Sequence, residues 1–210
     1  HLTNKVIEKL VEHKDKCILH CDVTGMGSTK IEPFVPTVEE SYNKFKQLIE
    51  KGFPIEHVVL RIDPVVPTEK GLNTVKKVLE TFKESGIKRV RFSILDMYKH
   101  VKDRFYNAGF PIPYNTFHAP YEIRKKVYDM FKEYGKKYNF DIEVCAEPGF
   151  KSIPCLSQKD IDILGLTDKI TLVGSAEQRT NCECPANKHQ LCSYSKENKC
   201  KHGCLYCYMK

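Results

Sequence analysis

The stretch HVVLRID, residues 57–63, is the clearest strand signal in the chain. Four of its seven residues are large aliphatics, three of these are β-branched, and Pro64 ends the run directly afterwards. Three further runs have the same character: CILHCDVT (17–24), RVRFSIL (89–95) and DIEVCA (141–146). Short apolar runs of this kind predict buried strands.

The segments between these runs carry helical signals. Thr37 and Glu40 have the spacing of a capping box, and Gly52 stands where a helix begun at Thr37 would end. Helices are predicted over residues 37–51, 69–85 and 120–138, with shorter ones over 3–13, 97–108 and 157–164. A short strand is predicted over residues 170–173. Strands that alternate with helices predict parallel pairing and an α/β fold.

Four strand–helix units are too few to close a barrel, and the chain opens on His1 rather than on methionine. We therefore expect a partial parallel (βα) barrel over residues 1–178, with one or two βα units upstream in the natural protein. Residues 179–210 differ in character, since they have few aliphatics and no helical or strand period. They are expected to form a cysteine-rich tail that needs a metal or the barrel to order it.

Composition excludes several classes of protein. The chain has 210 residues, 41% of them hydrophobic, and a net charge of +7, so it can bury a core. No apolar window reaches 18 residues, and no export signal is visible, which predicts a cytoplasmic protein without a membrane segment. Six of the ten cysteines fall between Cys182 and Cys207. This crowding favours metal ligation over a disulfide framework.

Polar residues follow each predicted strand, where parallel α/β sheets bind ligands. The candidate catalytic residues are Glu147, Asp63 and Arg61, and the candidate cofactor-binding residues are Thr24, Gly25, Gly27 and Ser93. Structural alternatives stay open at this point: an ion pair between Arg61 and Asp63, and a tight turn that needs the two glycines.

The sharpest motif is Cys200-x3-Cys204-x2-Cys207, with Tyr206 directly before the last cysteine. Three thiolates on one loop can each hold one iron of a [4Fe–4S] cubane and leave the fourth iron without a ligand from this loop. Cys182, Cys184 and Cys192 are candidates for a second metal, zinc or a cluster, with Cys155 or His189. Alternatively, they replace ligands of the first cluster or stay free.

This loop carries the signature of the radical S-adenosylmethionine (SAM) enzymes and is similar to the loop of the spore photoproduct lyase and DNA-repair-photolyase-like branch. The chain as a whole resembles the DUF1848 family. The resemblance rests on short motifs in the family's order: Glu32-Pro33-Phe34-Val35-Pro36, Arg61-Ile62-Asp63-Pro64, Phe92-Ser93-Ile94-Leu95-Asp96-Met97-Tyr98, Cys145-Ala146-Glu147, Cys182-x-Cys184 and the terminal cysteine loop.

The resemblance implies a radical-SAM-like partial barrel that binds a [4Fe–4S] cluster and SAM. It implies reductive cleavage of SAM to a 5′-deoxyadenosyl radical that acts on an unknown substrate, with a flavodoxin- or ferredoxin-like electron donor. Two features depart from the radical SAM pattern. The cysteine loop is at the C-terminus instead of after the first strand, and the turn from Thr24 to Gly27 lacks the acid of a Gly-Gly-Glu turn.

Two other interpretations compete with this one. A non-catalytic protein with a structural zinc or iron–sulfur tail would also place cysteines close together. Nucleic-acid binding has weaker support, because most basic residues alternate with acidic ones on the predicted helices.

Overall fold

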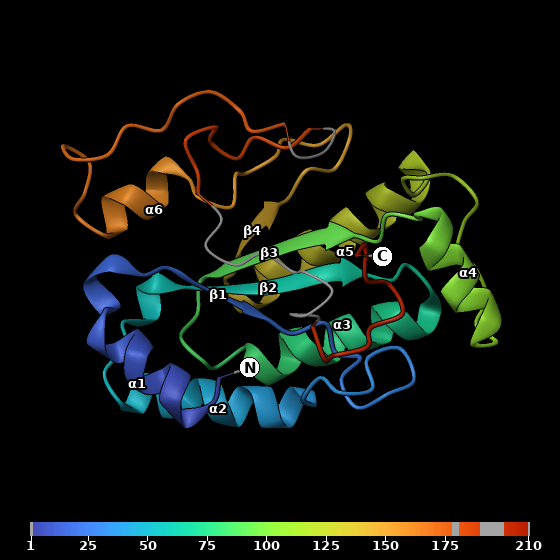
Figure 1. Ribbon diagram of the computed structural model, residues 1–210, viewed down its shortest axis with the longest axis horizontal. Helices are drawn as coiled ribbons and strands as arrows, with labels where there is room; N and C mark the ends of the chain where they lie inside the picture. Colours follow the sequence, from blue (N-terminus) through green and yellow to red (C-terminus); the bar gives the residue numbers. More distant parts are fainter. Residues whose placement is uncertain (1, 178–180, 190–199, 210) are drawn as a thin grey trace.

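The computed structural model describes residues 2–177, 181–189 and 200–209. At its centre four parallel strands lie side by side in chain order (Figure 1). They are β1 (Leu19–Asp22), β2 (Val58–Val65), β3 (Arg89–Ile94) and β4 (Asp141–Val144). The predicted α/β class and parallel pairing are confirmed.

All six predicted helices are present, most of them a residue or two shorter than predicted. They are α1 (Asn4–Glu12), α2 (Val38–Glu50), α3 (Glu69–Phe82), α4 (Lys99–Asn107), α5 (Tyr121–Tyr138) and α6 (Gln158–Ile163). Two 3-10 turns, η1 (Lys14–Lys16) and η2 (Ile55–His57), lead toward β1 and β2. The capping box of Thr37 and Glu40 forms as expected.

The prediction of a strand over residues 170–173 is wrong. This segment is irregular and pairs with no strand among the described residues. Ile170 and Val173 are both exposed, so the segment has no buried apolar face that would favour a place in the sheet.

One face of the sheet is apolar and is covered by helices. Phe92 of β3 stacks on Phe131 of α5, with 4.0 Å between the ring centres. Phe45 of α2 and Phe82 of α3 contact each other in the same core, and all four rings are buried. This layer supplies most of the apolar burial that stabilises the domain.

The other face of the sheet is charged. The register places Asp22, Arg61, Arg91 and Glu143 in one row across the four strands. Glu143 accepts hydrogen bonds from Arg89 (2.8 Å) and Arg91 (2.5 Å), and Arg89 reaches Asp160 of α6 at 2.6 Å. Helix α6 lies on this side of the sheet (Figure 1) and contributes Asp160 to the ion pairs.

The described strands form an open sheet, and its closure into a partial barrel stays a prediction. The boundary expected between residues 178 and 179 lies outside the described residues. Across the part of the chain that is described, no helix has both the length and the apolar character to traverse a bilayer.

Candidate cofactor site at the carboxyl ends of the strands

A cavity of ≈ 870 Å³ opens where the four strands end. Its size is that of a site for a small molecule or cofactor. Strand ends and their loops supply one side, including Asp22, Arg61, Asp63 and Asp96. The C-terminal loop supplies another, with His202, Cys204, Tyr206 and Cys207.

The C-terminal loop lies beside the segment that follows β1, although the two are far apart in sequence (Figure 1). The Leu205 N–H donates to the Ile31 carbonyl at 3.0 Å, and the Phe34 N–H donates to the His202 carbonyl at 3.4 Å. The His202 Nδ1 lies 3.0 Å from the Phe34 carbonyl oxygen. Gly203 has φ +66°, and a Cβ there would lie 3.3 Å from the Pro33 ring, so glycine suits this contact.

Helix α4 holds the end of this loop. The Arg104 guanidinium donates to the Cys207 carbonyl at 2.5 Å and to the Met209 carbonyl at 2.8 Å. Cys204 and Cys207 thereby line the cavity, whereas Cys200, at the start of the loop, is exposed.

Glu32 joins the C-terminal loop to the first strand. Its Oε1 accepts hydrogen bonds from Thr24 Oγ1 at 2.5 Å and from the Tyr206 hydroxyl. The residue is fully buried, and its Oε2 has no hydrogen-bond partner among the described residues. Burial raises the pKa of Glu32, and burial beside this carboxylate raises the pKa of Tyr206.

Glu32 was not among the site residues predicted from the sequence, where it stands only within the motif Glu32-Pro33-Phe34-Val35-Pro36. Its position in the loop after the first strand, directly before Pro33 in sequence, is the signal that could have identified it as a site residue.

Arg61 and Asp63 form the ion pair that the sequence left open. Arg61 donates to Asp63 Oδ2 from Nη2 at 2.5 Å and from Nε at 3.0 Å, and the Ser93 hydroxyl donates to Oδ1. The Asp63 N–H also donates to Asp22 Oδ1 at 3.2 Å. Surrounding protein and the nearby Asp63 raise the pKa of Asp22 well above its usual value.

The other predicted site residues occupy different places. Thr24 lines the cavity, but Gly25 and Gly27 do not. A Cβ on Gly27 would lie 1.8 Å from the Pro36 carbonyl oxygen, so the turn requires glycine there. Ser93 and Glu147 are buried behind the cavity lining, where Glu147 accepts the Ile94 N–H at 2.7 Å. Contact of these residues with a substrate or cofactor stays a prediction.

Four cysteines line the cavity away from the C-terminal loop: Cys145, Cys155, Cys182 and Cys184. The Cys145 and Cys155 sulfurs are 4.0 Å apart, and the Cys155 N–H donates to Cys184 Sγ at 3.3 Å. Hydrogen bonds from the Cys145 and Cys184 thiols, together with Arg61, lower the pKa of Cys155. Donation to Cys155 and burial raise the pKa of Cys184. Cys192 lies outside the described residues.

The donor chemistry of the C-terminal loop fits an iron–sulfur cluster, since thiolates are the usual ligands of such clusters. Burial raises the pKa of Cys204 to about 11, so this thiol stays protonated at neutral pH unless a metal replaces the proton. Among the described side chains, no three His, Cys, Asp or Glu are arranged as the ligands of one metal ion.

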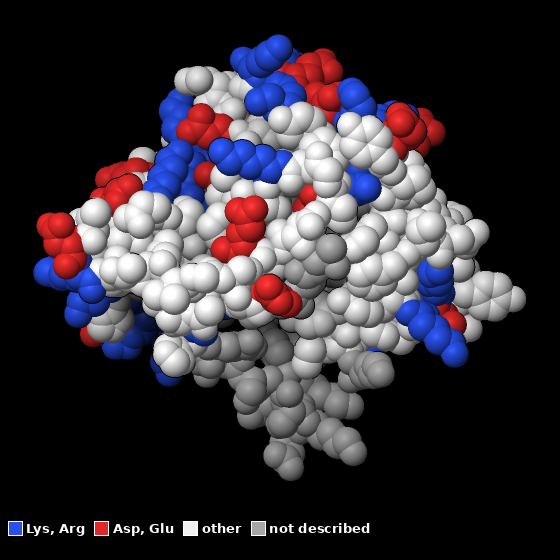
Figure 2. Space-filling model, turned by 90° about the horizontal axis from the view of Figure 1, so that it is seen from above, with Lys and Arg blue, Asp and Glu red and all other residues white. Residues whose placement is uncertain are grey.

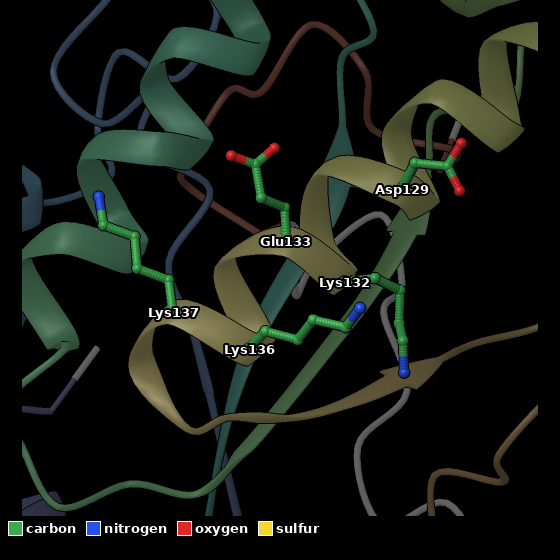
Figure 3. Close-up of a pocket in the computed structure, with 5 residues that line it drawn as sticks. All are labelled: Asp129, Lys132, Glu133, Lys136 and Lys137. Carbon is green, nitrogen blue, oxygen red and sulfur yellow. The ribbon is translucent and has the colours of Figure 1, made fainter.

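A second hollow lies on the outer surface of α5, lined by Asp129, Lys132, Glu133, Lys136 and Lys137 (Figure 3). Its side chains point in different directions and do not converge on a common centre. The face that Figure 2 shows likewise has Lys and Arg interspersed with Asp and Glu over its described part. Because the hollow lacks converging side chains and that face mixes charges of both signs, the cavity is the candidate site.

One comparison with known proteins gave a match. The family model described as Domain of unknown function (DUF1848) covers residues 2–209. No curated protein and no solved structure matches the chain.

Proposed function

The chain belongs to the DUF1848 family, and from the site described above we propose that it is a radical SAM-type iron–sulfur enzyme. In this proposal Cys200, Cys204 and Cys207 hold a [4Fe–4S] cluster at the mouth of the cavity. The fold is then a radical-SAM-like partial barrel, and the setting is the reducing cytoplasm, where thiolate ligands persist.

The position of the C-terminal loop carries the proposal. In radical SAM enzymes the cysteine loop follows the first strand, and here it is the last segment of the chain. In space, however, Leu205 and His202 hydrogen-bond to the segment that follows β1. The departure in sequence order therefore leaves the loop beside the first strand.

Glu32 supports the binding of SAM. The turn from Thr24 to Gly27 lacks the expected acid. Glu32 places a carboxylate beside this turn, since it accepts a hydrogen bond from the Thr24 hydroxyl. Because Thr24 and Tyr206 both bind Oε1, Oε2 has no hydrogen bond among the described residues. This oxygen is closed to solvent, so in this proposal the neighbouring Tyr206 moves aside when Oε2 accepts a donor such as the methionyl ammonium.

The charges of the cavity also favour a cationic cofactor. Asp22, Glu32, Asp63 and Asp96 are among the described residues that line it, and Arg61 is paired with Asp63. The pKa values of Asp22 and Glu32 are raised, so a bound cation would favour the ionised form of both groups. SAM carries a sulfonium and an ammonium group, which such a lining attracts, whereas the phosphates of a nucleic acid would be repelled. Arg61 and Ser93 both hydrogen-bond to Asp63, so this carboxylate keeps a fixed orientation at the cavity where a substrate would bind.

Cys200, Cys204 and Cys207 would hold the cluster, which would supply one electron, drawn from a flavodoxin- or ferredoxin-like donor, for the cleavage of SAM to methionine and a 5′-deoxyadenosyl radical able to abstract hydrogen from a substrate. Arg61 and Asp63 line the cavity in which that substrate would lie. Glu147 holds the Ile94 backbone at the end of β3 and acts as a positioning residue.

The proposal is tested by incubating the anaerobically reconstituted protein with dithionite and SAM and measuring 5′-deoxyadenosine. We expect product from the wild type and none from Cys204→Ala. Glu32→Gln should weaken SAM binding about tenfold or more, the usual effect of losing a charged hydrogen bond. Glu39→Gln is the matched control, because Glu39 is exposed on α2 and away from the cavity.

A protein that carries the cluster but forms no 5′-deoxyadenosine would refute the proposed activity. Zinc in place of iron and sulfide would instead establish the structural tail.

A further inference from the structure

The four cavity cysteines outside the C-terminal loop form a second group of sulfur atoms, here called the inner thiol group: Cys145, Cys155, Cys182 and Cys184. They come from three separate segments: the end of β4, the loop before α6 and the Cys-x-Cys segment. All four line the same cavity. Because the three segments are separate in sequence, it is the fold that brings these cysteines to one cavity.

Contacts link three of the four cysteines, joining Cys145 to Cys155 and Cys155 to Cys184. The Cys155 sulfur lies 4.0 Å from the Cys145 sulfur, and the Cys155 backbone N–H donates to the Cys184 sulfur at 3.3 Å. The backbone holds the Cys-x-Cys segment against the neighbouring loop, since Ala176 N–H donates to the Cys184 carbonyl at 2.6 Å. Ser175 donates from its hydroxyl to the Cys182 carbonyl at 2.6 Å as well.

Polar N–H groups are directed at these sulfurs. Arg61 donates to Cys155 Sγ from Nη1 at 3.4 Å and to Cys145 Sγ from Nη2 at 3.6 Å. The Cys155 N–H donates to Cys184 Sγ at 3.3 Å. A neutral thiol is a weak acceptor, and cysteines buried only as small apolar groups have no need of such donors. Hydrogen bonds to sulfur are typical of thiolates that ligate metals.

We propose that the inner thiol group is a second metal site, which binds a thiophilic centre through the thiolates of Cys145, Cys155, Cys182 and Cys184. Zinc and an iron–sulfur cluster share this ligand chemistry, and the metal assay below distinguishes them. Four protein thiolates complete the coordination of either centre, so the site is closed and fixes the Cys-x-Cys segment to the end of β4.

This assignment revises the ligands that the sequence suggested. His189 is exposed and is not among the residues that line the cavity, whereas Cys145 and Cys155 are. The Cys145 and Cys155 sulfurs are 4.0 Å apart, and no three of the described His, Cys, Asp or Glu side chains surround one point, so metal binding requires the side chains of the inner thiol group to turn. The site is independent of the cluster proposed for the C-terminal loop.

The test uses the full chain with Cys200, Cys204 and Cys207 all changed to Ala, which removes the other proposed metal site. Iron, sulfide and zinc are measured after anaerobic purification. We expect about one zinc, or about four irons with matching sulfide, per chain. A further Cys155→Ser or Cys184→Ser change should lower this content several-fold, whereas Cys17→Ser, at a half-buried cysteine two residues before β1, should not.

Metal-free protein in the triple variant, with its circular dichroism unchanged from wild type, would overturn the inference. So would a disulfide between Cys145 and Cys155 in anaerobically purified protein. Trypsin separates these cysteines into peptides 138–151 and 152–159, so mass spectrometry detects that disulfide as a linked pair. Wild-type protein that lacks the C-terminal cluster while the triple variant keeps its metal would count against the proposed function alone.

Discussion

His20 lies on the charged face of the sheet, with Arg61 of β2 and Arg91 of β3 as its charged neighbours. Burial, with repulsion from Arg91 and Arg61, lowers the pKa of His20 to about 4, and this outweighs the opposing effect of Cys155 and Asp160. A neutral imidazole at this position therefore belongs to the folded state at physiological pH.

This lowered pKa predicts a specific pH dependence of stability. Between pH 6.5 and 4 the unfolded chain binds a proton at His20 that the folded chain does not, so the free energy of unfolding falls as pH falls through this window. The loss is about 2–3 kcal/mol at most, from the size of the shift.

Urea unfolding of wild type and His20→Gln from pH 4 to 7 measures this effect. The variant should lose stability less steeply on acidification. The raised pKa of Asp22 acts in the opposite sense in both proteins and cancels in the comparison. Identical slopes would mean that His20 is protonated in the folded state.

Glu32 shows why the role of a residue cannot always be predicted from sequence. Its hydrogen-bond partner Tyr206 is 174 residues further along the chain, and no local pattern relates the two. Asp63 differs, because its partner Arg61 is two residues away and the pairing could be anticipated.

Among the elements, α6 is joined to the sheet by a buried ion network, to which it contributes Asp160. Arg89, Arg91, Glu143 and Asp160 are all buried, and Glu143 bonds to both arginines. Removing one partner of such a network leaves uncompensated charge, which costs more than the network gains by forming.

Glu143→Gln should therefore lower the free energy of unfolding by about 3 kcal/mol or more. Asp129→Asn is the matched control, since it breaks an exposed pair with Lys125 on α5 and should leave stability unchanged. Equal effects of the two changes in urea unfolding would show that the network contributes no more than a surface pair.

Helix α4 positions the proposed cluster loop through one side chain. Arg104 donates to two carbonyls at the end of the chain, Cys207 and Met209. Residues that orient metal ligands typically change metal affinity by about ten- to a hundredfold.

Arg104→Ala should accordingly lower iron bound to the C-terminal loop about tenfold at limiting iron, with Arg104→Lys intermediate. Lys99→Ala, an exposed change on the same helix, is the control. Iron and sulfide per chain provide the measurement, and full retention in Arg104→Ala would exclude this positioning role.

At the scale of the whole molecule, the spacing of apolar residues and the positions of turn residues predicted nearly all of the helices and strands. The four strands and six helices follow from apolar runs, a capping box and glycine stops, because each signal is local. The charged face of the sheet was not anticipated, since Arg89, Arg91 and Glu143 find their partners only once β3 and β4 pair. The path of the C-terminal loop also depends on distant contacts.

The candidate site likewise has one part that local sequence predicts and another that depends on contacts between distant segments. The strands end at one edge of the sheet, as parallel pairing predicts, and Asp22, Arg61 and Asp63 line the cavity there. The approach of Cys204 and Cys207 to that edge depends on residues 31–34, and the inner thiol group depends on three segments that meet only in the folded chain.

Low-temperature EPR of the reduced, anaerobically prepared protein, recorded with and without SAM, tests the central claim most directly. We predict a cubane signal that changes shape when SAM is added and that disappears in Cys204→Ala. Recording it in the Cys155→Ser background lowers any contribution from the inner thiol group several-fold. A cubane signal that SAM leaves unchanged, or the absence of any cubane signal from Cys155→Ser, would contradict the account.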